Sequence, residues 1–225
     1  MKVLAIVQAR CGSQRFPLKS LATIHGRPML AHVLERAEEI QQVDLVVLAV
    51  PQKDLPRLGH LWPHVYGGEE LDVLARFSEA AEEYGADVVV RLTGDCPLLA
   101  PDIIDDALTG FKQYMPQGGY LAVCQPYSRV ADGWDAEIFS IDLLRRAHMS
   151  ATKAQQEHVT TWMRSNVLVA AWPVDRDYRK LKCSVDTPAD LQVVLKIREQ
   201  LTDPQDFRAW ATWEAWNRAG RPVST

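Results

Sequence analysis

The sequence predicts an α/β protein in which a mostly parallel sheet is covered by helices on both faces. Short runs rich in Val, Ile and Leu alternate with longer amphipathic stretches along the chain. The short runs are apolar at successive positions, as expected of strands that are buried on both faces of a sheet. Strands that alternate with helices of this length indicate βαβ units, whose crossover connections make the joined strands parallel.

The first half of the chain carries the clearest elements. Pro28 suits the first turn of a helix, and Gly85 suits the end of the next one. Acidic residues follow Pro101 and favour a helix N-terminus there. In chain order we predict a strand at 2–9, a helix at 28–40, a strand at 44–50, a helix at 71–85, a strand at 86–94 and a helix at 100–114.

The second half continues the alternation of strands and helices. In chain order we predict a strand near 134–139, helices near 140–150 and 153–165, strands near 167–172 and 181–185, and a helix at 187–200. Residues 1–200 are therefore predicted to form one domain, and residues 201–225 a helical extension. In that extension Trp210, Trp213 and Trp216 lie three apart, along one helix face. They either pack on the domain or form a subunit contact.

Composition limits the possible functions. Of the 225 residues 47% are hydrophobic and 24% are charged, and the net charge is −4. An acidic chain without a dense basic face is not expected to bind a nucleic-acid polymer or an anionic membrane. No apolar run approaches the roughly 20 residues of a membrane helix, and the N-terminal run is too short for a signal peptide. The four cysteines form no CxxC pair, which argues against zinc and disulfides and for a cytoplasmic protein.

The basic segment QARCGSQRFPLK, residues 8–19, follows the first predicted strand directly. Ligands of parallel sheets bind at the carboxyl ends of the strands, so this segment lies at the expected binding edge. Its small residues offer backbone N–H groups and its cations suit a polyphosphate. A P-loop would have a glycine in place of Leu18, and no GxGxxG occurs. A solvated basic loop remains the alternative for this segment alone.

Two aspartates strengthen the interpretation as a nucleotide site. Asp95 follows the strand predicted at 86–94, and Asp186 follows the one predicted at 181–185. Either could be a simple helix N-cap. Together they place two carboxylates at the same edge as the basic segment, and carboxylates beside a polyphosphate call for a cation between them. Mg²⁺ takes one or two carboxylates plus phosphate oxygens, so the sequence predicts a Mg²⁺–nucleotide site.

The motifs QARCGSQRFPLKSL, GRPML, RLTGDCPLL, GWDAEIF, EHVT and SVDTPADL, in this order, resemble those of the spore coat polysaccharide biosynthesis protein F-like (SpsF-like) proteins. These belong to the cytidylyltransferase family, with the synthetases of CMP-Kdo and CMP-sialic acids. The resemblance covers roughly residues 2–200. It implies a Rossmann-like, three-layer α/β/α nucleotide-diphospho-sugar transferase fold. It also implies Mg²⁺-dependent transfer of CMP from CTP to a small anionic acceptor (a nonulosonic or Kdo-like acid, or a phosphonate or phosphate), release of pyrophosphate, and a homodimer.

The resemblance also implies roles for individual residues. Those expected to bind the nucleotide are Gln8, Ala9, Arg10, Gly12, Ser13, Arg15, Lys19, Arg76, Thr93 and Gly94. Those expected to be catalytic are Arg15, Lys19, Asp95 and Asp186, the last two as Mg²⁺ ligands. The resemblance places Gly133, Asp135 and Glu137 near the acceptor. Three further residues are candidate acceptor contacts because the acceptor is expected to be an anion, and the motif EHVT supports the last of them: Arg91, Arg129 and His158.

Some of these residues also have plainer interpretations. Arg76 could instead form an i,i+4 ion pair with Asp72, and Arg91 could form a surface salt bridge. A lone helical histidine such as His158 is more often a surface or core residue than a base. The chain also departs from the family pattern at three places. Leu18 stands where the family has glycine, Cys11 where it commonly has methionine, and CQPYSRVAD where a different lead into GWDAE is expected. The last departure bears on the identity of the acceptor more than on that of the nucleotide.

Two other classes of protein remain possible from the sequence. A metal-dependent glycosyltransferase would share the sheet and use a D-x-D pair, for which DRD at 175–177 and DAE at 135–137 are weak candidates. A non-catalytic nucleotide-binding or assembly protein would use the tryptophan face as its partner surface. The joint presence of Arg15, Lys19, Asp95 and Asp186 favours the enzyme.

Overall fold

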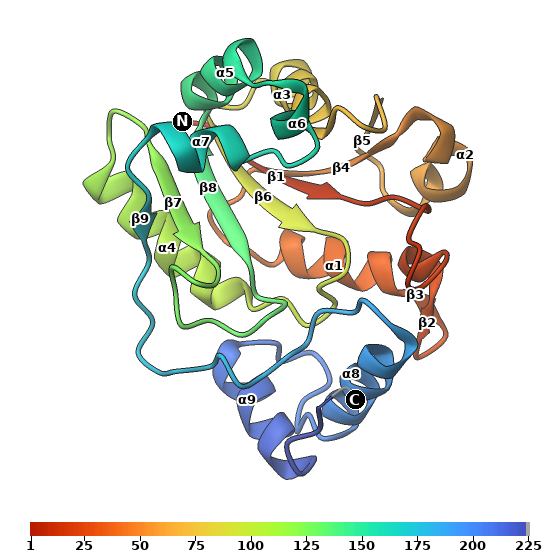
Figure 1. The fold of residues 1–225 in the computed structure, drawn as a ribbon. Coiled ribbons are helices and arrows are strands. Elements are labelled where there is room, and N and C mark those ends of the chain that lie inside the picture. Colours follow the sequence, from red (N-terminus) through yellow and green to blue (C-terminus); the bar gives the residue numbers. More distant parts are fainter. Residues whose placement is uncertain (224–225) are drawn as a thin grey trace.

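The computed structural model, which describes residues 1–223, contains a seven-stranded sheet with helices on both faces (Figure 1). The strand order is β5-β4-β1-β6-β8-β7-β9. Only β8 is antiparallel to its two neighbours, β6 and β7; every other pairing in this sheet is parallel. The strands are β1 (Val3–Gln8), β4 (Leu45–Pro51), β5 (Val65–Gly68), β6 (Val88–Thr93), β7 (Tyr120–Val123), β8 (Ala136–Ser140) and β9 (Ala170–Ala171). The prediction of a mostly parallel, three-layer α/β fold is confirmed.

The helices bury the two faces of the sheet in separate cores. Alternate residues of β1 face opposite sides: Val3, Ala5 and Val7 join one core, and Leu4 and Ile6 join the other. One core is covered by α1 (Met29–Glu38), α4 (Pro101–Tyr114), α8 (Pro188–Glu199) and α9 (Ala209–Arg218). The other is covered by α3 (Val73–Glu83), α5 (Ile141–Ser150) and α7 (Thr161–Asn166), as Figure 1 shows.

Short elements complete the chain. A two-stranded hairpin of β2 (Thr23–Ile24) and β3 (Arg27–Pro28) precedes α1. Two four-residue helices, α2 (Leu55–Leu58) and α6 (Lys153–Gln156), lie in connections. Three 3-10 turns occupy Lys19–Leu21, Gln52–Asp54 and Gly59–Leu61. No helix within residues 1–223 is long and apolar enough to cross a membrane.

Most predicted elements are present, but two are corrected. The helix predicted at 153–165 is divided into α6 and α7. The strand predicted at 181–185 does not form: the segment is buried, yet it makes only an isolated bridge between Asp132 and Lys182. Its backbone instead bonds to loops, with the Val185 N–H donating to Asp95 O (2.8 Å) and the Cys183 N–H to Asp132 O (2.7 Å). These bonds still bring Asp186 to the edge where β1 and β6 end.

Two glycines allow the loops at this edge to approach closely. Gly94 donates its N–H to Gln8 O (2.8 Å), and a Cβ at residue 94 would lie 2.9 Å from that oxygen. Gly133 has φ +109°, and a Cβ there would lie 2.5 Å from the Ser184 nitrogen. Side chains at either position would push the loops apart.

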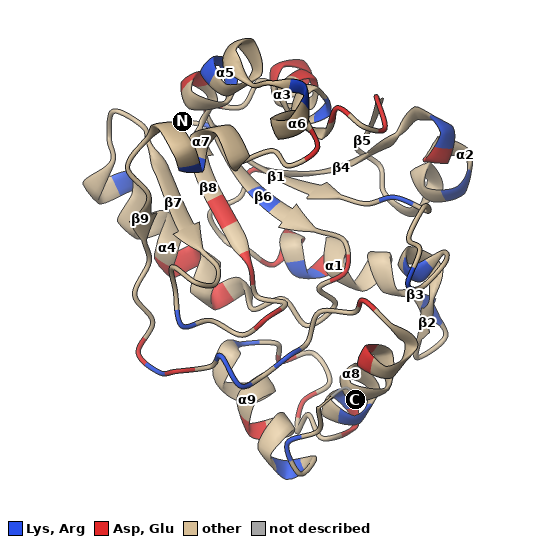
Figure 2. Ribbon diagram, viewed as in Figure 1, with Lys and Arg blue, Asp and Glu red and all other residues tan. Residues whose placement is uncertain are grey.

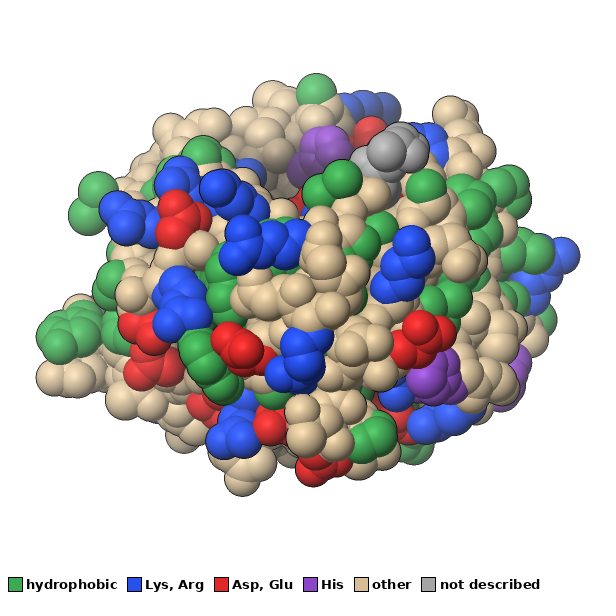
Figure 3. All heavy atoms as spheres, turned by 90° about the horizontal axis from the view of Figure 1, so that it is seen from below, with side chains coloured by type: hydrophobic (Ala, Val, Ile, Leu, Met, Phe, Trp, Pro, Cys, Tyr) green, Lys and Arg blue, Asp and Glu red, His purple; other side chains and the backbone are tan. Residues whose placement is uncertain are grey.

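The C-terminal helix α9 packs on the domain. Trp216 is 2% exposed, and Trp213 lies between it and Tyr178, with ring centroids 4.9 and 5.3 Å away, in tilted and edge-on contacts. Trp210 is 53% exposed and lies beside the Arg176 guanidinium, 4.5 Å from its ring centroid. Two of the three tryptophans therefore pack inward. The face viewed in Figure 3 mixes basic, acidic and hydrophobic side chains without a continuous basic surface.

Candidate active site

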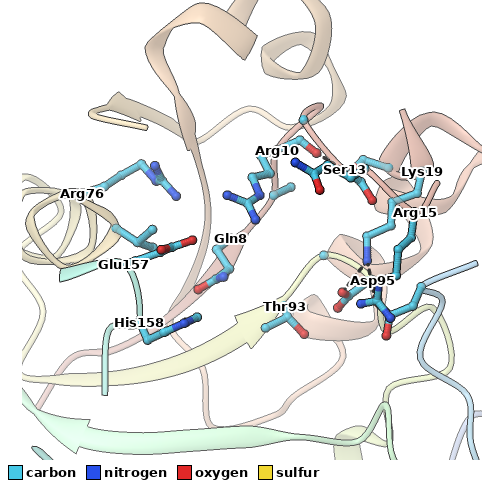
Figure 4. Close-up of a pocket in the computed structure, with 17 residues that line it drawn as sticks. Gln8, Arg10, Ser13, Arg15, Lys19, Arg76, Thr93, Asp95, Glu157 and His158 are labelled. Carbon is cyan, nitrogen blue, oxygen red and sulfur yellow. Dashed lines mark hydrogen bonds and ion pairs between the residues drawn. The ribbon is translucent and has the colours of Figure 1, made fainter. Parts of the chain in front are cut away.

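A cavity of about 680 Å³, called the large cavity below, opens at the carboxyl ends of β1 and β6 (Figure 4). Gln8 and Thr93 are paired at the ends of these two strands, and both line it. The other lining residues are Ala9, Arg10, Gly12, Ser13, Gln14, Arg15, Lys19, Ser20, Val73, Arg76, Gly94, Asp95, Glu157, His158 and Asp186. Every residue predicted to bind the nucleotide is among them.

The basic segment is held in a compact loop by its own backbone. The Cys11 carbonyl accepts the N–H groups of Ser13 (3.0 Å) and Leu18 (3.4 Å), and Asp54 accepts the Cys11 N–H (2.9 Å). Leu18 has φ 56° and ψ 27°, in the left-handed region that favours glycine. Its side chain is 41% exposed and does not line the large cavity. The leucine therefore imposes backbone strain without narrowing the space over the loop.

Lys19 lies between the two predicted metal ligands. Its ammonium donates to Asp95 Oδ2 (2.8 Å), Asp186 Oδ1 (3.1 Å) and the Val185 carbonyl (2.9 Å), and an Arg15 Nη2 lies 3.0 Å from the same Asp186 oxygen. Burial alone would lower the pKa of Lys19, but the two carboxylates outweigh it and the pKa is raised. Burial would likewise raise the pKa of Asp95, but the Lys19 charge and hydrogen bonds hold it below its usual value.

This geometry fits a metal ion that a phosphate group helps to bind. The Asp95 and Asp186 oxygens already share one cation, the Lys19 ammonium. Within residues 1–223 no group of three or more His, Cys, Asp or Glu side chains could hold a metal without other ligands. Mg²⁺ commonly takes only one or two carboxylates and completes its shell with phosphate oxygens and water. Asp95 and Asp186 supply two such carboxylates.

Two arginines lie on the other side of the large cavity. Figure 4 shows Arg10 and Arg76 extending toward each other above Glu157. Burial and the nearby Arg10 charge lower the pKa of Arg76, as expected where two cations face a common space. Asp72 caps α3 by accepting the Ala75 N–H (2.8 Å), and Arg76 donates to the Glu69 carbonyl. The alternative Asp72–Arg76 ion pair is therefore wrong.

A second cavity of about 260 Å³, called the small cavity, adjoins the first, and Thr93, Asp95 and Asp186 line both. Arg91 on β6 and Glu137 on β8 lie directly opposite each other in the antiparallel register. Figure 2 shows a basic position on β6 beside an acidic position on β8. Glu137 is 1% exposed and also accepts from Arg164 Nη2 (2.6 Å) and the Tyr120 hydroxyl. Burial would raise the pKa of Glu137, but Arg91 and these two donors lower it.

The predicted acceptor residues are divided by the structure. Arg91, Asp135 and Glu137 line the small cavity, but His158 lines the large one. Arg129 is exposed and lines neither cavity. Arg91 does form a salt bridge, as its plainer interpretation expects. The partner, Glu137, is buried, so this salt bridge is not on the surface.

Sequence reasoning missed several residues of the small cavity. They are Cys96, Cys124, Gln125, Asp132, Arg164 and Ser184. Arg164 reaches the cavity from α7 through contacts with Glu137 and Tyr120, which lie 27 and 44 residues away in the chain. No local motif marks it. Asp132 could have been noticed, because it comes directly before the GWDAE motif.

Comparison with known proteins agrees with this geometry. The sequence profile of the family described as Cytidylyltransferase matches residues 4–188. An uncharacterised protein of Methanocaldococcus jannaschii, MJ1063, is 30% identical over 210 residues, which cover 88% of this chain and 84% of that protein. A 3-deoxy-manno-octulosonate cytidylyltransferase of Pelobacter propionicus is 36% identical over 115 residues. That match covers 48% of this chain and 44% of the enzyme, so the chain spans under half the length of this relative.

A solved structure extends the similarity over the whole chain. A cytidylyltransferase from Leptospira borgpetersenii superimposes with a TM-score of 0.90 at 26% sequence identity. The match covers 100% of this chain and 98% of that structure. The similarity therefore includes the C-terminal helices as well as the sheet.

Proposed function

Because this chain belongs to the cytidylyltransferase family and is a nucleotidyltransferase, we propose that it transfers CMP from CTP to a small anionic acceptor in a Mg²⁺-dependent reaction that releases pyrophosphate. One observation carries the proposal: Lys19, Asp95 and Asp186 form a single charged centre between the two cavities. A triphosphate in the large cavity and an acceptor in the small one would meet at this centre.

In the proposed reaction an acceptor oxygen attacks the α-phosphorus of CTP, and the bond to the β-phosphate breaks as pyrophosphate leaves. Arg15 and Lys19 would neutralise the phosphate oxygens, and Arg10 and Arg76 would hold the nucleotide from the opposite side. Asp95 and Asp186 would hold the metal ion. When bound, the metal ion offsets phosphate charge and acidifies the attacking hydroxyl. Positioning and charge neutralisation then supply most of the rate enhancement.

We further propose, from the order of its motifs, that the chain is an SpsF-like member of the family, that it is cytoplasmic and that it forms homodimers. All four cysteines are buried and free, which fits a reducing compartment. The glycosyltransferase alternative has less support. In the DRD motif Asp177 is bound to Arg179, and neither Asp175 nor Asp177 lines the large or the small cavity. In the DAE motif Asp135 and Glu137 line the small cavity, but Glu137 is paired with Arg91 and Arg164. The family assignment also favours an enzyme over a non-catalytic binding protein.

The test is pyrophosphate release from CTP, UTP, ATP and GTP with a panel of sugar acids, hydroxy acids and phosphonates. We expect release with CTP only, abolished by a chelator and restored by Mg²⁺. Asp186→Asn should lose this activity, whereas Asp142→Asn, a control on the exposed side of α5, should retain it. Equal release from all four nucleotides, or full activity in the presence of the chelator, would contradict the proposal.

A further inference from the structure

The charged side chains of the small cavity fall into two groups. Apart from Asp95 and Asp186, which belong to the Lys19 centre, it contains an arginine group and an aspartate pair. The arginine group consists of Arg91, Arg164 and the Glu137 carboxylate between them. The aspartate pair consists of Asp132 and Asp135, in the loop that leads into β8. The two groups have opposite net charge.

The arginine group has one positive charge in excess. Glu137 accepts hydrogen bonds from both guanidiniums, but one carboxylate balances only one of them. The Arg164 side chain is 37% exposed, and its hydrogen bonds within residues 1–223 involve only Nε and Nη2. A guanidinium donor therefore remains available for an anionic group of the acceptor. This part of the cavity suits the anionic acceptor of the proposed function.

The aspartate pair has no positive counterpart among the described residues. Within residues 1–223 neither Asp132 nor Asp135 forms an ion pair with a basic side chain, and Asp135 accepts the Gly133 N–H (3.0 Å). Burial raises the pKa of Asp135 to about 6, and the neighbouring Asp132 charge adds to this effect. Two adjacent carboxylates at the wall of a cavity are stabilised by a cation or by strong hydrogen-bond donors.

A third, independent feature points to a ligand at this place. Ser184 also lines the small cavity, is 8% exposed, and its hydroxyl has no hydrogen-bond partner within residues 1–223. Buried hydroxyls are normally hydrogen-bonded, so an unpartnered one at a cavity wall is explained if a ligand supplies the partner. The Ser184 backbone nitrogen donates to the Asp132 carbonyl (3.1 Å), which places the serine next to the aspartate pair.

On the basis of the proposed function, we infer that the acceptor is zwitterionic: its anionic group binds at Arg164, and an ammonium group binds between Asp132 and Asp135, next to Ser184. An amino-substituted sugar acid or hydroxy acid has this chemistry. The volume of about 260 Å³ lies below the roughly 300–1,000 Å³ of typical ligand pockets, so the acceptor is small. A second metal ion fits less well, because within residues 1–223 no third His, Cys, Asp or Glu completes a metal site with this pair.

The test offers acceptors in matched pairs that differ only at one position, such as glucosaminate and gluconate, extended to sugar acids of five to nine carbons. Pyrophosphate release is measured with CTP and Mg²⁺. We expect the amine of the preferred pair to have a kcat/KM at least roughly tenfold above its hydroxyl analogue, as expected for one desolvated charge pair. In the double variant Asp132→Asn/Asp135→Asn the preference for the amine over its hydroxyl analogue should disappear, mainly because the KM for the amine rises.

Controls separate failure of this inference from failure of the proposed function. The double variant should keep the wild-type thermal shift with CTP and Mg²⁺, and Asp142→Asn should keep both the shift and the amine preference. If CTP and Mg²⁺ do not raise the Tm of the wild-type protein, the proposed function itself is contradicted. If CTP binds but the best acceptors lack an amine, if no amine is turned over, or if the double variant retains the preference, the zwitterionic acceptor is wrong.

Discussion

Replacing Glu137 by glutamine tests how much the buried ion pairs of the small cavity stabilise the fold. Glu137 is 1% exposed and is bonded to Arg91, Arg164 and Tyr120. The Glu137→Gln change keeps one oxygen acceptor but leaves two guanidiniums close together without a counter-charge. Removing one partner of a buried ion pair costs about 3–5 kcal/mol, and the remaining amide oxygen favours the lower end, about 3 kcal/mol. For a chain of this size that corresponds to a fall in Tm of roughly 6–12 °C.

The matched control is Glu82→Gln, which removes a carboxylate from an exposed ion pair. Glu82 and Arg145 have 48% and 47% exposed side chains, so the same chemical change should cost less than about 1 kcal/mol. Both variants would be compared by urea and thermal unfolding. Equal losses of stability in the two variants would refute the reasoning, because burial would then have no effect on how much an ion pair contributes to the free energy of unfolding.

Three further predictions follow from the site and the core. Asp95→Asn and Asp186→Asn should remain folded by circular dichroism but lose about 10²–10³-fold in turnover; wild-type turnover in both would refute their role. Because burial raises the pKa of Asp135 to about 6 from 3.8, its ionisation should lower the free energy of unfolding by up to roughly 3 kcal/mol as pH rises between these values. Urea unfolding at stepped pH should show this loss abolished in Asp135→Asn, and an unchanged pH profile would count against it. Trp216→Ala should cost about 3–5 kcal/mol and Trp210→Ala less than about 1 kcal/mol in chemical unfolding; similar values would mean that α9 does not pack as described.

The residues of the large cavity could be predicted because they follow local rules. The carboxyl ends of parallel strands meet at one edge, so an apolar strand followed by Arg10, Arg15 and Lys19, and another followed by Asp95, indicate the edge without knowledge of the strand order. All of these residues line the large cavity. Asp186 is there as predicted, although the strand expected before it is absent. An apolar run only indicates burial, and residues 181–185 are buried against loops.

The small cavity could not be predicted in the same way. It depends on β8, whose antiparallel direction places Glu137 opposite Arg91, and on α7, which brings Arg164 to the same carboxylate. Neither the direction of a strand nor the approach of a distant helix is encoded in local periodicity. Arg129 shows the converse: it is basic and close to the GWDAE motif in sequence, yet it is exposed and outside both cavities.

The most direct test of the central claim is thermal unfolding with each of CTP, UTP, ATP and GTP, with and without Mg²⁺. It requires no knowledge of the acceptor. A ligand at about 100 times its Kd adds about 2.7 kcal/mol, which raises the Tm by roughly 5–10 °C for a chain of this size. The account predicts this shift for CTP with Mg²⁺ and a much smaller one for the other nucleotides. No shift with any triphosphate would contradict the assignment of the large cavity as a CTP site.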